Sequence, residues 1–331
     1  MRILIVGLGS IGRRHLKNLR RLRPDAEITV WRQHGQCTVP EEIAALADGF
    51  VNTFEGALQA EPEVAVISNP ATLHSETGVA LSNQGIHLFV EKPISHSVEG
   101  ARALVESCRQ RNLVLTVGYN LRFYRPLQVM RVALREKCIG AGAVFRAEAC
   151  QHLSTWRVGY DYRQSVSARS ELGGGVLLEL SHEIDYARWF MGEVQSVSAQ
   201  VARVGDLDID VEDTATLLLS FVGGAVGSIH LNMVESPGVR RCRIAGTRGT
   251  LTWDAASHEV RQFCGAGGEW ADLYTGTDLD FSGAYVAEME QFLECVNGRA
   301  LVEVSGEDAL RTLEVILAAK RSAIEGRAVQ V

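Results

Sequence analysis

Apolar and polar positions follow two different patterns before and after about Asn120. Before it, short apolar runs separate amphipathic stretches that have helical spacing. The runs are apolar on both faces, as in buried strands of a parallel sheet, and lie at Ile3–Gly7, Ile28–Trp31, Val64–Ser68, His87–Val90 and Leu113–Val117. The helical stretches are Ile11–Leu22, Glu41–Ala47, Leu73–Asn83 and Val98–Arg111. This alternation predicts a doubly wound parallel sheet of the Rossmann type in residues 1–121.

The segment 122–331 has several strands in succession. They are predicted at Val144–Cys150, Val194–Val204, Asp213–Phe221, Ala225–Asn232, Arg240–Ala245, Thr250–Asp254 and Glu259–Phe263. Helices are predicted at Pro126–Lys137, Leu180–Met191, Tyr285–Val296 and Gly306–Ile324. Strands without intervening helices indicate an α+β domain with an open, mostly antiparallel sheet. Because these helices are too few to cover both faces, we expect an apolar face that joins a homodimer or homotetramer.

The composition fits a globular chain of two domains and argues against several classes of protein. Of the 331 residues 46% are apolar, and a net charge of −7 argues against nucleic acid or an anionic membrane as partner. Seven cysteines without a CxxC pair predict reduced thiols and no zinc site. No apolar run is long enough to span a membrane, and a strand at the very start leaves no room for a signal peptide. We therefore expect a cytoplasmic protein with no bound metal.

The clearest motif is the loop Gly7-Leu8-Gly9-Ser10-Ile11-Gly12, which joins the first strand to the first helix. In this setting Gly7 permits the tight turn, Gly9 lets the backbone approach a pyrophosphate, and Gly12 allows close packing of helix on strand. Ser10 and Ile11 begin the helix, whose free N–H groups and dipole attract phosphate. The loop predicts an NAD(P) cofactor. The alternative is a glycine-rich turn without a ligand.

The end of the second strand bears on which dinucleotide binds. A site for NAD usually has Asp or Glu about 20 residues after the glycine loop, where it binds the ribose 2′-hydroxyl. Here the segment Val30-Trp31-Arg32-Gln33 contains no carboxylate. Arg32 can pair with a 2′-phosphate, so the segment favours NADP. The alternative is that Arg32 is a solvated strand end and the cofactor is NAD.

Two more segments follow strand ends at the carboxyl edge of the sheet, where ligands bind in such folds. Asn69-Pro70 follows the third strand, with His74 on the next helix, and Glu91-Lys92-Pro93 follows the fourth. The proline after Lys92 fixes the backbone and permits a cis peptide bond.

A candidate general base lies in the second half of the chain. If the stretch after Gly173-Gly174-Gly175 is helical, Glu179, His182 and Asp185 are three residues apart and share one face. A histidine beside carboxylates is suited to accept a proton. The alternative is an amphipathic helix with a capped, hydrogen-bonded histidine.

The loop Trp156–Glu171 is a candidate for binding substrate. It contains Trp156 and Tyr162, whose rings can stack on a sugar, and Arg163, which can bind phosphate or carboxylate. These residue types favour an anionic or nucleotide-linked sugar. An exposed polar loop is the alternative.

These motifs together resemble the glucose–fructose oxidoreductase and inositol dehydrogenase family (Gfo/Idh/MocA). The matching pieces run in order along the chain: Gly7–Gly12, Asn69-Pro70 with His74, Gly85–Pro93, Gly118–Arg122, His182–Asp185, Val211–Ala215, Gly246–Leu251 and Ser305–Ala309. The glycine-rich stretch before His182, with the loop ahead of it, is similar to members associated with bacterial surface-sugar biosynthesis.

The resemblance implies a dinucleotide-binding domain, 1–121, and a domain for substrate binding and oligomerisation, 122–331. It implies that Lys92 lies near the nicotinamide and the substrate hydroxyl, and that His182 accepts the hydroxyl proton as hydride leaves. The family's further acid lies four residues before the histidine, where this chain has Leu178, so Glu179 is the candidate replacement. Asp185 matches the family's second carboxylate. Asn120 then belongs with the cofactor, and Tyr119 and Arg122 with the substrate.

Three functions fit these features. The first is an oxidoreductase that moves hydride between NAD(P) and a secondary alcohol or ketone carbon of a sugar, inositol or nucleotide sugar. The second is a glycosidase-type enzyme that oxidises a sugar carbon transiently, with a permanently bound cofactor. The third is a non-catalytic protein that senses a dinucleotide. Because the chain retains Lys92 and His182, the first is favoured and the third ranks last.

Overall fold

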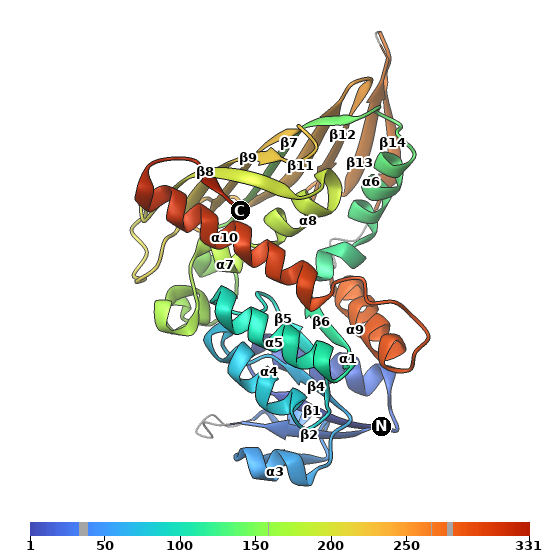
Figure 1. The fold of residues 1–331 in the computed structure, drawn as a ribbon, viewed down its shortest axis with the longest axis vertical. Helices are drawn as coiled ribbons and strands as arrows, with labels where there is room; N and C mark the ends of the chain where they lie inside the picture. The colour runs from blue at the N-terminus through green and yellow to red at the C-terminus, as the bar shows by residue number, and fades with distance from the viewer. Residues whose placement is uncertain (33–38, 158, 266, 277–280) are drawn as a thin grey trace. The chain divides into compact units, whose positions relative to one another are not determined.

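The computed structural model describes residues 1–32, 39–157, 159–265, 267–276 and 281–331, which form two compact units (Figure 1). Met1–Asn120 and Ser282–Leu313 make up the first unit, and Leu121–Phe281 and Glu314–Val331 the second. The sequence analysis placed a single domain boundary after residue 121 and did not predict that a later segment of the chain belongs to the first unit. The spacing of apolar residues indicates whether a segment is a helix or a strand, but not on which unit it packs.

The first unit contains a six-stranded sheet in the order β3-β2-β1-β4-β5-β6, and its strand pairs are parallel. The strands are β1 (Arg2–Val6), β2 (Glu27–Trp31), β3 (Gly49–Val51), β4 (Val64–Ile67), β5 (His87–Glu91) and β6 (Leu115–Gly118). The helices are α1 (Ser10–Leu22), α2 (Glu41–Ala44), α3 (Phe54–Gln59), α4 (His74–Ser82), α5 (Val98–Gln110) and α9 (Ser282–Val296). The predicted Rossmann sheet is confirmed. Strand β3 and helix α3 were not predicted, because three and six residues are too short for a recognisable period.

The returning helix α9 completes the core of the first unit. Its Met289, Phe292 and Leu293 are fully buried in one apolar cluster with residues of β1, β2, β4 and α1. The Phe292 ring packs edge-on against Phe89 of β5, with ring centroids 5.7 Å apart. The dinucleotide-type fold of this chain is therefore built from two separate segments of sequence.

The second unit contains a nine-stranded sheet in the order β14-β13-β12-β11-β7-β10-β9-β8-β15. Its strands are β7 (Gly142–Cys150), β8 (Val194–Ala202), β9 (Thr214–Phe221), β10 (Val226–Asn232), β11 (Val239–Gly246), β12 (Gly249–Asp254), β13 (Glu259–Cys264), β14 (Trp270–Thr275) and β15 (Val329–Gln330). Its helices include α6 (Arg125–Arg135), α7 (Val176–Glu179) and α8 (His182–Met191), and α10 (Gly306–Glu325) runs from the first unit into it. Only β7 and β10 pair in parallel, so the predicted mostly antiparallel sheet is confirmed. The exposed β14 and the two-residue β15 were not predicted.

One predicted helix is divided in the structure. The helix expected at Leu180–Met191 begins at His182, and α7 ends at Glu179 with Leu180 outside helical geometry (φ −99°, ψ 36°). Glu179 and His182 therefore lie on different helices, and the expectation that Glu179 shares a helix face with His182 and Asp185 was wrong. A break of one residue leaves the apolar spacing nearly unchanged, so the sequence pattern does not reveal it.

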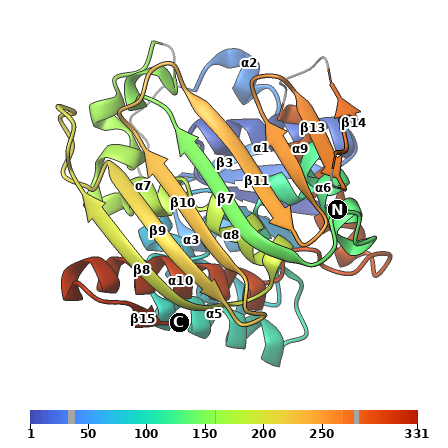
Figure 2. The same ribbon diagram turned by 90° about the horizontal axis from the view of Figure 1, so that it is seen from above.

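Figure 2 views the large sheet from its open face. The exposed residues of this face are more polar than expected: along β9 and β11 they alternate with buried ones and include Thr216, Ser220 and Arg243. Leu218 and Val226 are large apolar side chains that are exposed on it, at 60% and 52% exposure. The expectation of an apolar face was therefore wrong in composition: alternation shows that one face is exposed, but the exposed positions here carry mostly hydroxyl and charged groups.

The described part of the chain bears out two simpler expectations. Its six cysteines are all free thiols, and the seventh, Cys37, lies outside the described residues. None of the helices in this part is both long and apolar enough to cross a membrane.

Candidate dinucleotide site and candidate catalytic residues

The glycine loop packs tightly against the end of β4. Gly7 has φ +87°, and a Cβ there would lie 2.9 Å from the backbone of Ser68 and Asn69. A Cβ on Gly12 would lie 2.3 Å from the Gly7 oxygen and 2.7 Å from the Ser68 hydroxyl oxygen. That hydroxyl donates hydrogen bonds to the carbonyl oxygens of Val6 and Gly7, at 2.9 and 3.1 Å. Gly7 therefore permits the tight turn, and Gly12 allows the close packing of helix on strand, as predicted.

Gly9 differs because no atom of the described residues lies within 4 Å of the position that its Cβ would take. It caps α1, whose first hydrogen bond runs from the Arg13 N–H to the Gly9 oxygen at 3.0 Å. The N–H groups of Ser10, Ile11 and Gly12 precede that bond, and the first turn carries no acidic side chain. An open space next to unused N–H groups and the positive end of a helix dipole fits a pyrophosphate.

Arg32 directly follows β2, and its N–H donates to the Val51 oxygen of β3 at 2.9 Å. This position, at the end of the second strand, is the one at which a ribose-binding residue is expected. Gln33, the other polar residue of that segment, lies outside the described residues.

His74 connects the loops that follow β4 and β5. It is 1% exposed, with Nδ1 2.8 Å from the Pro93 oxygen and Nε2 2.8 Å from the Asn69 oxygen. Burial lowers the pKa of His74, so the neutral ring donates to one of these oxygens and lies against the other. The Asn69 amide in turn donates to the Thr77 hydroxyl at 3.1 Å. Asn69, Pro93 and His74, which the sequence assigned together to the cofactor site, are thus brought together, and Pro70 lies at the start of the same turn.

The Glu91-Lys92-Pro93 segment begins on the last residue of β5, and its Lys92–Pro93 peptide bond is cis. The Glu91 carboxylate points into the unit rather than out of it. Its Oε1 lies 2.5 Å from Nε2 of His15 on α1, and its Oε2 accepts the Lys92 N–H at 3.1 Å. Lys92 itself is half-buried. Glu91 therefore fixes the backbone that carries Lys92.

Arg122 and Asp185, in the second unit, bind each other. The Arg122 Nε and Nη2 lie 2.9 and 2.7 Å from the two Asp185 carboxylate oxygens, and the side chains are 5% and 1% exposed. This bidentate ion pair connects the 3₁₀ helix Asn120–Phe123 to α8. His182, the first residue of α8, is 8% exposed.

The other sequence-predicted residues are more scattered. Glu179 accepts a hydrogen bond from the Ser167 hydroxyl at 2.9 Å. Tyr119 and Asn120, at the end of β6, are buried at 0% and 3% exposure.

The loop after β7 places its aromatic residues around a small hollow that includes Trp156, Tyr160 and Tyr162. The Trp156 indole N–H donates to the Gln151 oxygen at 3.0 Å. Arg163 forms an exposed ion pair with Asp161 at 2.8 Å. These aromatic residues thus lie around one hollow, and the arginine has an acidic neighbour.

Two buried residues escaped the sequence analysis, His15 and Glu288. His15 lies about one turn beyond Gly12, on the face of α1 that also buries Leu16 and Leu19, and a polar residue at this apolar spacing was the available signal. Glu288 lies on α9, and local sequence gives no sign that this helix packs against β5.

A parallel sheet in this strand order, with a glycine loop opening onto free helix N–H groups, defines a dinucleotide-binding protein of the Rossmann class. Residues 1–119 match an oxidoreductase family with an NAD-binding Rossmann fold, and residues 148–331 match the C-terminal α/β domain of the same family. The chain belongs to this family, the Gfo/Idh/MocA oxidoreductases, as the sequence motifs indicated.

Its relatives include enzymes of sugar and inositol metabolism. The myo-inositol 2-dehydrogenase of Thermotoga maritima is 26% identical over 346 residues, covering 100% of this chain and 98% of that protein. The structure of a levoglucosan dehydrogenase with NADH is similar, with a TM-score of 0.89 at 19% identity over 100% of this chain and 99% of that one. So is WlbA dehydrogenase from Bordetella pertussis with NADH and UDP-GlcNAcA, with a TM-score of 0.86 at 21% identity over 100% and 97%.

Proposed function

We propose that the protein is an NAD(P)-dependent dehydrogenase acting on a secondary hydroxyl of a sugar, inositol or nucleotide sugar. The observation that carries the proposal is the glycine loop, with an open side at Gly9, in a chain whose family has an NAD-binding Rossmann domain. Relatives named as inositol dehydrogenases, and similar structures solved with NADH and a sugar ligand, support this class of substrate.

The first unit supplies the cofactor site. Gly7–Gly12 and the first N–H groups of α1 hold the pyrophosphate, and the loops joined by His74 hold the rest of the dinucleotide. When bound, the nicotinamide ring supplies a carbon that accepts or donates hydride. The relatives solved with NADH or NAD give no support for a preference for NADP. Such a preference, based on Arg32, stays a prediction.

His182 is the proposed general base. A secondary alcohol is too weak an acid to lose its proton unaided at neutral pH, and an imidazole can take that proton as hydride leaves the carbon. The buried Arg122–Asp185 pair lies one turn along α8 and holds the start of this helix in place. In this role Asp185 positions the helix rather than a sugar hydroxyl.

Lys92 is proposed to act as a cation. A charged ammonium cannot accept a proton, but it can donate a hydrogen bond to the substrate oxygen and stabilise the negative charge that develops there. Its backbone is held by the Glu91 carboxylate and its neighbour Pro93 by His74, so the lysine extends from a fixed loop.

The test is a pair of substitutions, His182→Ala and Lys92→Ala, measured on a panel of sugars, inositols and nucleotide sugars. Each is expected to lower kcat by roughly a hundredfold or more, the size of general acid–base effects. The dissociation constant of NADH should stay within about threefold, because neither side chain holds the phosphates. If His182→Ala turns over at nearly the wild-type rate, the base is another residue, and Lys92 or Glu179 must be considered.

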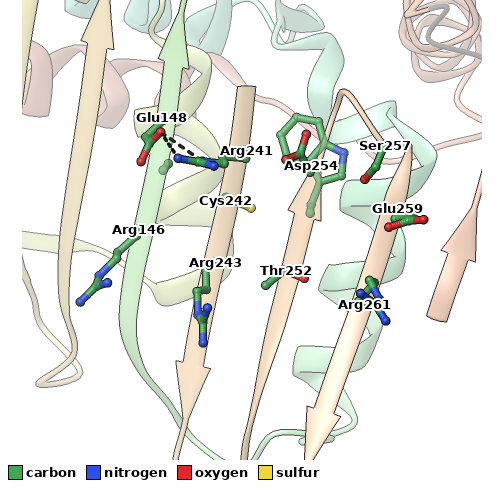
Figure 3. A pocket seen from close by; sticks show the side chains of 12 residues that line it. Arg146, Glu148, Arg241, Cys242, Arg243, Thr252, Asp254, Ser257, Glu259 and Arg261 are labelled. Carbon is green, nitrogen blue, oxygen red and sulfur yellow. Dashed lines mark hydrogen bonds and ion pairs between the residues drawn. The ribbon is translucent and has the colours of Figure 1, made fainter. Parts of the chain in front are cut away.

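We propose further that a second copy of the chain covers the open face of the nine-stranded sheet. A hollow of about 440 Å³ lies on this face over β7, β11, β12 and β13 (Figure 3). Arg146 and Arg243 are direct cross-strand neighbours in it, and like charges in that arrangement repel. Asp254 and Glu259 also line this hollow. The face therefore has both positive and negative side chains, which two copies related by a two-fold axis can pair with each other.

A further inference from the structure

The strongest unexplained feature lies in the interior of the first unit. Glu288 of α9 is 0% exposed, and neither of its carboxyl oxygens has a hydrogen-bond partner among the described residues. One nitrogen or oxygen of each of His15, Glu91 and Glu288 lies within 4.8 Å of those of the other two. His15 and Glu91 are already joined at 2.5 Å, so Glu288 is the third member of a buried group.

The surroundings of Glu288 do not favour a charged carboxylate. An ionised carboxyl without hydrogen bonds is very costly to bury, and such a group takes up a proton instead. Burial raises the pKa of Glu288 well above its usual range, and the nearby Glu91 carboxylate raises it further. A buried carboxyl group near a second carboxylate is therefore favoured in its neutral form.

The neighbours of Glu288 can be named from each packed element. Glu91 faces it from β5 and His15 from α1. On its own helix, the Tyr285 ring packs edge-on to His15 with centroids 6.3 Å apart, and the Arg14 guanidinium lies over Tyr285 at 4.5 Å. Of these neighbours, the His15 imidazole is joined to Glu91.

We infer that Glu288 is a neutral carboxylic acid beside the Glu91 carboxylate, and that its neutrality keeps the segment Glu91-Lys92-Pro93 in position. Glu91 has one oxygen on His15 and the other on the Lys92 N–H, so a shift of its carboxylate is passed directly to the Lys92 backbone. A neutral Glu288 leaves the Glu91 carboxylate in this position, whereas a second negative charge beside it would repel it. The positioning role rests on the proposed function of Lys92, whereas the protonation of Glu288 does not.

The first test measures urea unfolding from pH 5 to 8 for the wild type, Glu288→Gln and Glu290→Gln. An acid that is neutral when folded and ionised when unfolded loses stability as pH rises above its unfolded pKa of about 4.3. Glutamine keeps the shape without titrating. The equilibrium constant for unfolding of the wild type, divided by that of Glu288→Gln, should therefore rise by up to about tenfold for each unit by which the pH increases. Glu290 is exposed on the same helix, so its variant should follow the wild type.

The second test is made on the wild-type protein and uses a variant only to assign the signal. At neutral pH the infrared spectrum of the wild-type protein should contain the carbonyl band of a protonated carboxylic acid. The band should persist as the exposed carboxyl groups ionise, and it should be missing in Glu288→Gln. A wild-type spectrum without the band, or a Glu288→Gln variant that loses stability equally at every pH, would overturn the inference. A loss of stability in Glu288→Gln that is the same at every pH would indicate that Glu288 is charged in the folded protein, as it would be in a divalent cation site.

The positioning role has its own measurement. With an active substrate, Glu288→Gln should keep kcat within about threefold, whereas Glu288→Ala should lower kcat about tenfold or more with little change in the NADH dissociation constant. If the proton is found but Glu288→Ala keeps full activity, the positioning role is wrong. If Lys92→Ala is fully active, the proposed function fails, and the unfolding and infrared results still decide the protonation.

Discussion

Gly9 and Gly12 belong to one loop but have different surroundings. Gly12 faces backbone at 2.3 Å, whereas Gly9 faces open space and has a φ of −68°, which any residue adopts. One glycine is therefore required by the fold and the other by the ligand. A sequence motif does not make this distinction, because both positions read simply as glycine.

The two roles predict different effects of the same substitution. Gly12→Ala should lower the free energy of unfolding by roughly 1–3 kcal/mol, because its Cβ overlaps packed atoms. Gly9→Ala should keep the wild-type stability within about 0.5 kcal/mol and weaken NADH and NADPH at least about tenfold, because its Cβ takes the space of the pyrophosphate. Denaturant unfolding and fluorescence titration with both dinucleotides measure these quantities. Wild-type affinity in Gly9→Ala would place the pyrophosphate elsewhere, and tighter binding of NADH than NADPH by the wild type would contradict the preference based on Arg32.

The residue types in the sequence identified most of the candidate site, but they did not show which side chains bind each other. Lys92 and Asn69 lie just after strand ends and His74 begins the next helix, positions that a local pattern suffices to identify. Asp185 and Arg122 are 63 residues apart, and their ion pair depends on how α8 packs against the 3₁₀ helix before α6. Glu288 is buried for the same kind of reason, since α9 returns to a core formed by the first 120 residues.

At the scale of elements, the Arg122–Asp185 pair holds the start of α8. Removing one partner of a buried ion pair leaves the other charge in an apolar setting. Asp185→Asn should therefore lower the free energy of unfolding of the second unit by about 3–5 kcal/mol. Asp161→Asn, which breaks the exposed pair with Arg163, should leave the free energy of unfolding nearly unchanged, because solvent screens such a pair.

Chemical denaturation of both variants makes this comparison. Arg122→Met combined with Asp185→Leu should recover much of the loss, since an apolar pair of similar volume fills the same space. Equal stability of Asp185→Asn and the wild type would show that the pair is not structural. Asp185 would then keep only the role of the family's second carboxylate, which the resemblance implies.

Element types were largely predictable, since buried parallel strands and alternating antiparallel strands have distinct periods. The failures share a cause. Short elements such as β3 and β15 have no period to detect, and the break at Leu180 is a backbone event that leaves the side-chain pattern intact.

At the scale of the whole molecule, the open sheet face sets the expected assembly. The wild type should be a dimer or tetramer by light scattering at micromolar concentration. Arg146→Glu together with Arg243→Glu should shift it toward monomer, because the charges that face the second copy are reversed. Lys17→Glu, at an exposed position of α1, serves as the control for changed net charge. A monomeric wild type, or variants that assemble as before, would refute an interface on this face.

The return of α9 to the first unit also has a consequence for synthesis on the ribosome. The strands of the dinucleotide sheet emerge early, but Met289, Phe292 and Leu293, which complete their core, emerge after nearly the whole second unit. At about 5–20 residues per second this delay is roughly ten to thirty seconds. During that time the nascent sheet has an uncovered apolar surface, which is the kind of surface that chaperones bind. The N-terminal domain of this chain is thus first in sequence and among the last parts to finish folding.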